Sequence, residues 1–79
     1  MEIDIYATNK PTVFIAVQAT TQVPEQVVRD YGVKTKPWKT RDISDGKKWT
    51  ALKSDEVVAD IQRQGYAVLG AAVITTEIV

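Results

Sequence analysis

The sequence opens with MEIDIYATNKPTVFIAVQ (residues 1–18), a stretch that contains two strand patterns. Apolar and polar residues alternate at its start, which places Met1, Ile3 and Ile5 on one face of a half-buried strand. After a turn-favouring Asn-Lys-Pro cluster, residues 12–18 are apolar enough on both faces to lie inside a sheet. We therefore expect an antiparallel hairpin.

Two short helices are predicted to pack on this sheet. The first covers residues 23–31, because Pro24 and Glu25 suit the first turn of a helix and Gly32 suits the left-handed position after the last turn. The helix is too short to be stable alone, so its apolar side chains must pack on a sheet. These side chains are Val23, Val27, Val28 and Tyr31.

The second helix is predicted over residues 55–64. Ser54 is expected to cap it with its hydroxyl group, acidic residues follow in the first turn, and Gly65 ends it. Its buried face is expected to contain Val57, Val58 and Ile61.

Residues 33–53 differ in character, because lysine and arginine alternate there with β-branched residues and both tryptophans. Asp45-Gly46 at the centre favours a tight hairpin turn. Pro37 cannot donate to a β-ladder, so the first arm is an edge strand or partly a loop. A two-residue turn would put both tryptophan rings on one face and Lys39, Arg41 and Lys48 on the other, whereas a three-residue loop would place the rings on opposite faces.

The last stretch, residues 66–79, is apolar on both faces. This pattern predicts a central strand, or a strand extended onto a second copy of the chain. The complete expectation is a single α+β domain over residues 1–79. It is a small two-layer sandwich of ββαββαβ order, with two short helices packed on a mainly antiparallel sheet.

The composition argues against an enzyme. The chain has 79 residues, no cysteine and no histidine, which excludes disulfide frameworks, the usual zinc ligands and Ser-His or Cys-His triads. Its four glycines are isolated, so no phosphate-cradling loop is present. Carboxylate pairs occur, but turn chemistry and the helix dipole explain them. We predict no catalytic residue, cofactor or metal site.

The start of the chain carries acidic residues where a signal peptide needs basic ones, and the longest apolar run is too short to span a bilayer. The sequence thus predicts a cytoplasmic protein with no membrane contact.

Charge is distributed unevenly along this neutral chain. Residues 34–53 carry a net charge of +5 and the remainder −5, so the segment should attract anionic groups. It also contains both tryptophans, which suit a protein hot spot or stacking on nucleic-acid bases. The candidate partner-binding residues are Lys34, Lys36, Trp38, Lys39, Arg41, Lys47, Lys48, Trp49 and Lys53.

Three functional hypotheses follow. The first is a small accessory or inhibitor-type module, of the kind found in phage, that docks on an acidic protein through this basic hairpin and forms a homodimer through its last strand. The alternative is a module that binds single-stranded DNA or RNA, against which the lack of overall positive charge counts. An enzyme or small-ligand domain ranks third.

Overall fold

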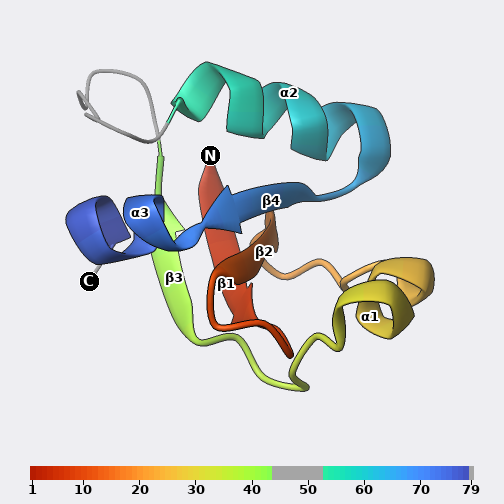
Figure 1. The fold of residues 1–79 in the computed structure, drawn as a ribbon. Coiled ribbons are helices and arrows are strands. Elements are labelled where there is room, and N and C mark those ends of the chain that lie inside the picture. Colours follow the sequence, from red (N-terminus) through yellow and green to blue (C-terminus); the bar gives the residue numbers. More distant parts are fainter. Residues whose placement is uncertain (44–52, 79) are drawn as a thin grey trace.

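The structure, a computed structural model, describes residues 1–43 and 53–78 (Figure 1). The elements in chain order are β1 (Glu2–Ala7), β2 (Val13–Gln18), α1 (Glu25–Tyr31), β3 (Lys39–Asp42), α2 (Ser54–Gln64), β4 (Ala67–Gly70), α3 (Ala71–Val73) and a π-helical turn (Ile74–Ile78). The α+β class with short helices on an antiparallel sheet is confirmed. The expected turn at Asp45-Gly46 and the second hairpin arm fall on residues 44–52, outside the described residues.

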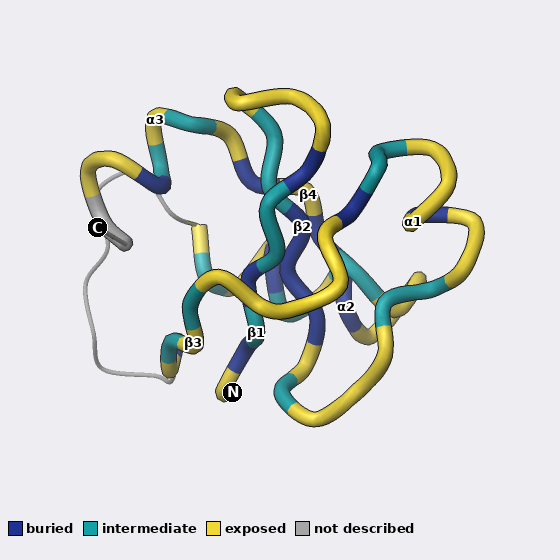
Figure 2. Tube along the Cα trace, turned by 90° about the horizontal axis from the view of Figure 1, so that it is seen from below, coloured by how far each residue is buried: buried dark blue, intermediate teal, exposed yellow. Residues whose placement is uncertain are grey.

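The four strands form one antiparallel sheet in the order β3-β1-β2-β4. The hairpin predicted from residues 1–18 is present, with Ile5 opposite Ala16. β1 and β2 occupy the centre because their apolar side chains fill the interior, whereas β3 and β4 are the outermost of the described strands. Figure 2 shows the buried residues gathered along β1 and β2.

The two longer helices pack on opposite faces of the sheet. Ala16 belongs to the cluster that contains Val57 and Ile61 of α2, whereas its neighbour Ile15 belongs to the cluster that contains Val27 of α1. Consecutive strand residues point to opposite faces, so each helix covers its own face. We call these the α2 face and the α1 face. α1 is only seven residues long and covers part of its face.

The predicted C-terminal strand is wrong beyond Gly70. β4 has four residues and lies at an edge, not at the centre, and the chain then turns into α3. Ile74 is thereby buried in the same cluster as Leu69, which an extended chain would not allow. Core burial has overridden the β-propensity of this stretch. A dimer contact through a long last strand loses its basis, and dimerisation itself stays a prediction.

Two helix details also differ from expectation. Val28 is 38% exposed, because neighbouring residues of a helix point about 100° apart and Val27 takes the position against the sheet. Ser54 is the first helical residue of α2, not its cap, and no side chain caps this helix.

The glycine after α1 is in the expected left-handed conformation, and it also permits a close contact. Gly32 has φ +63°, and a Cβ atom built on it would overlap the side-chain amide of Asn9. The neighbouring Asn9 N–H donates to the Tyr31 carbonyl at 3.1 Å. The Asn9–Tyr31 hydrogen bond therefore joins the end of α1 to the β1–β2 turn, and Gly32 leaves room for the Asn9 side chain.

We expect Gly32→Ala to lower the free energy of unfolding by about 1–3 kcal/mol. A side chain at this position is strained by the positive φ, and it would also displace the side chain of Asn9. Gly70→Ala is the matched control, since no atom lies within 4 Å of its Cβ position and its φ is −86°. Urea unfolding measures both. Equal stability of the two variants would contradict this account of Gly32.

Candidate functional site

The chain lies along β1 before β3 begins. The Lys34 N–H donates to the Ala7 carbonyl at 3.0 Å, and the Trp38 N–H donates to the Ile5 carbonyl at 2.7 Å. Between these anchors Pro37 has no N–H to offer, and the regular ladder starts only at Lys39. The first arm, expected to be an edge strand or partly a loop, contains both a loop and a strand, and β3 is an edge strand among the described strands. We call residues 34–41 the basic edge.

The register assigns the two cations of β3 to one face. Lys39 lies opposite Ile5 and Arg41 opposite Ile3, so both belong to the α2 face and are half-buried. Lys34 and Lys36, in the loop before β3, are exposed. Four of the predicted basic site residues therefore lie along one edge of the sheet.

Trp38 is an exposed aromatic residue within this basic edge. The residue is 40% exposed, and its ring centroid lies 5.4 Å from that of Phe14 with the planes tilted by 41°. The Lys39 ammonium lies over the ring, 5.5 Å from its centroid. This combines an aromatic contact with a cation–π contact.

The turn that would decide between the two-residue and three-residue registers lies outside the described residues. Strand alternation alone would direct Trp38 and Lys39 to opposite faces, whereas the Lys39 ammonium lies over the Trp38 ring. Trp38 precedes β3, so strand alternation does not fix the direction of its ring. The ring instead reaches Phe14, the residue of β2 that faces Ala7 of β1.

Hydrogen bonds and an ion pair hold β3 against β1. Thr40 donates its hydroxyl to Asp4 Oδ1 at 2.7 Å, and the other oxygen of Asp4 accepts the Thr20 N–H at 3.3 Å. The amino group of Met1 lies 3.6 Å from Asp42 Oδ1. These contacts lie on the inner side of β3, and no described strand pairs with its outer side.

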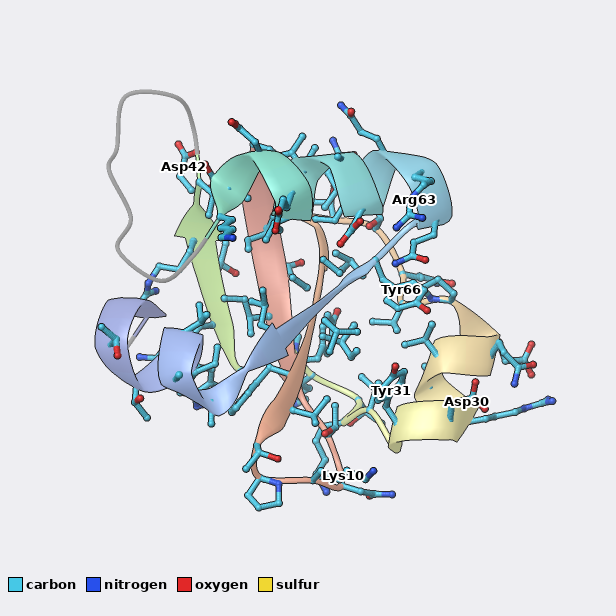
Figure 3. All side chains as sticks on the ribbon, turned by 45° about the horizontal axis from the view of Figure 1, so that its top comes forward. Lys10, Asp30, Tyr31, Asp42, Arg63 and Tyr66 are labelled. Carbon is cyan, nitrogen blue, oxygen red and sulfur yellow. The ribbon has the colours of Figure 1, made fainter. Side chains whose placement is uncertain are left out.

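The other predicted site residues lie elsewhere. Lys53 precedes α2 and lines a hollow of about 240 Å³ between α2 and β4, together with Glu56 and Asp60. Lys47, Lys48 and Trp49 lie outside the described residues. Figure 3 shows Asp42 at the end of β3 and Arg63 at the far end of α2, so Arg63 is remote from β3.

A second hollow, of about 300 Å³, adjoins the basic edge and was not anticipated from the sequence. It lies between α1, β1 and the start of the loop. Val28 lines it, and a sequence pattern assigns that residue to the core. Val28 is exposed because α1, with seven residues, covers only part of this face. The lining residues are Tyr6, Gln22, Val23, Val28, Val33, Lys34 and Thr35.

The described residues contain no group of three or more acidic side chains that could hold a metal ion. None of the described helices, of which α2 is the longest at eleven residues, could cross a membrane. No protein-family model, curated protein or solved structure matches this chain. The basic edge and the two hollows are the surface features of the described residues that can recognise a ligand.

If Phe14 supports the Trp38 ring, the two side chains should be coupled energetically. We expect a double-mutant cycle of Phe14→Leu and Trp38→Leu to give a coupling of about 0.5–1.5 kcal/mol in the free energy of unfolding, the range for aromatic pairs. Urea denaturation of the four proteins measures it. Additivity within about 0.3 kcal/mol would show that the rings act independently.

Proposed function

We propose that this protein is a non-enzymatic binding module that captures an acidic, extended segment of a partner protein along the outer side of β3. The observation that carries the proposal is the combination of an edge strand unpaired by any described strand, two half-buried cations on it and an exposed tryptophan at its start. An added strand would gain main-chain hydrogen bonds from β3 and charge contacts from its side chains.

Edge lysines also protect proteins against aggregation, and this second role sharpens the expected specificity. A second copy pairing β3 with β3 would bring the same cations, Lys39 and Arg41, face to face. A segment with glutamate or aspartate at alternate positions would meet those cations with opposite charge. The edge therefore disfavours its own copies and favours an acidic strand.

The arrangement supports weak, salt-sensitive binding. Surface ion pairs contribute about 0–1 kcal/mol each and are screened by salt. Trp38 offers a better anchor, since Phe14 and Lys39 already limit the motion of its ring and less side-chain entropy is lost on binding.

Single-stranded nucleic acid is the competing ligand, because lysines around an exposed ring also suit phosphates and bases. Two features favour the protein segment. The Lys39 ammonium occupies one side of the Trp38 ring, where a base would stack. The outer side of β3, with which no described strand pairs, also offers main-chain donors and acceptors to a protein strand, which a nucleotide chain cannot match.

The proposal can be tested with the heptapeptide Ac-TETETET-NH2, which carries glutamate at alternate positions. We expect this peptide to shift the backbone amide resonances of Lys39–Asp42 in ¹⁵N NMR spectra, and to bind less tightly as salt rises. The double variant Lys39→Gln/Arg41→Gln should weaken binding about fivefold, because two surface ion pairs are lost.

Lys10→Gln is the matched control, since Lys10 is an exposed lysine in the β1–β2 turn, outside the basic edge. The lysine version of the peptide, Ac-TKTKTKT-NH2, should not bind. Absence of shifts at β3 would contradict the proposal. Tighter binding of octathymidylate, with quenching of Trp38 fluorescence in a Trp49→Phe background, would favour the nucleic-acid function instead.

A further inference from the structure

The 300 Å³ hollow beside α1 is an apolar feature open to solvent. Val28 on its wall is 38% exposed, whereas Val33 is 8% exposed and belongs to the core cluster beneath α1. Tyr6 and Val23 pack against the same cluster. The hollow thus has a fixed apolar floor and one accessible aliphatic wall.

The size of the hollow restricts what it can take. Pockets for drug-sized ligands and cofactors span about 300–1,000 Å³, so this one lies at the lower limit. An aliphatic side chain of a partner fits within such a volume, which is small for a whole cofactor. Pockets of this kind commonly receive one anchor residue of a protein partner.

Lys34 connects this hollow to the basic edge. It lines the hollow, and its N–H is bonded to the Ala7 carbonyl of β1. The next anchor, the Trp38 N–H on Ile5, lies at the start of β3. The two surfaces are therefore attached to the same strand, and a ligand that spans both meets a pre-arranged site.

The two surfaces belong to different faces of the sheet. Lys39 shares the α2 face with Ile5, whereas Tyr6, the next residue of β1, points to the α1 face and lines the hollow. An added strand also directs alternate side chains to the two faces. Its acidic residues can thus meet Lys39 and Arg41 while a residue near its end turns toward the hollow.

We propose that this hollow receives an aliphatic side chain, such as leucine, at the end of the acidic partner segment. The inference rests on the proposed function and names the recognised sequence more closely: alternating acidic residues followed or preceded by one aliphatic anchor. Lys34 at the rim matches the negative charge of that segment. A purely polar acidic strand would leave the hollow empty.

The test compares three peptides on the full chain: Ac-TETETET-NH2 and the same sequence with one leucine added at its amino or its carboxyl end. Both ends are needed because an added strand can run in either direction along β3. We expect one leucine peptide to bind about fivefold more tightly than the parent, from burial of one aliphatic side chain. It alone should shift the amide resonances of Val28, Val33 and Thr35.

Val28→Gln should abolish that fivefold gain and leave the affinity for the parent peptide unchanged. Val68→Gln is the matched control, since Val68 is 47% exposed on β4, at the other edge of the sheet, and should keep the gain. The NMR spectrum of each variant reports its folding. If Val28→Gln disturbs it, Val28→Thr supplies a smaller polar change at nearly constant shape.

The outcomes separate the two proposals. Equal binding of all three peptides, with shifts confined to β3, would overturn the anchor and leave the proposed function standing. A leucine gain that survives Val28→Gln would also overturn it. Failure of every peptide to bind would overturn both. Shifts at Val28 that depend on protein concentration alone would assign the hollow to a second copy and overturn the anchor.

Discussion

Burial on both faces of the β1–β2 hairpin is the constraint on which the other elements depend. Five side chains of this hairpin have no exposed surface: Ile3, Ile5, Ile15, Ala16 and Val17. Because Ile15 and Ala16 point in opposite directions, the chain must supply an apolar cover on each side. It supplies α2 with the C-terminal turn on one face and the shorter α1 on the other. β3 and β4 then pair with β1 and β2, one on each side of the hairpin.

The unequal covers account for the candidate site. α1 has only seven residues and buries Val27 against the sheet. Val28 therefore stays exposed beside the hollow. On the other face, Trp38 lies on Phe14, which α2 does not fully cover. Both features arise at the same side of the sheet, where the loop after α1 runs along β1. The concentration of lysine in that loop gives this side its charge.

Several contacts hold this side of the molecule rigidly, which suits it to recognition. Asp4 joins β3 to β1 and to the turn after β2, and the backbone bonds at Lys34 and Trp38 hold the loop at two points. A surface held in this way loses little conformational entropy when a partner binds. In the proposed function, the charges favour an acidic partner, and the proposed aliphatic anchor adds binding energy that salt does not screen.

Local chemistry alone determined much of this protein: the hairpin from its alternation, the left-handed Gly32 and Gly65 at the helix ends, the edge position that follows from Pro37, and the uneven charge. Tertiary packing decided the rest. The β-prone C-terminal stretch becomes helical because this conformation buries Ile74 in the core. Val28 is exposed because Val27 takes the position of α1 that faces the sheet. Trp38 meets Lys39 because Phe14 lies beneath it. Each of these outcomes depends on residues distant in sequence, and periodicity describes only neighbours along the chain.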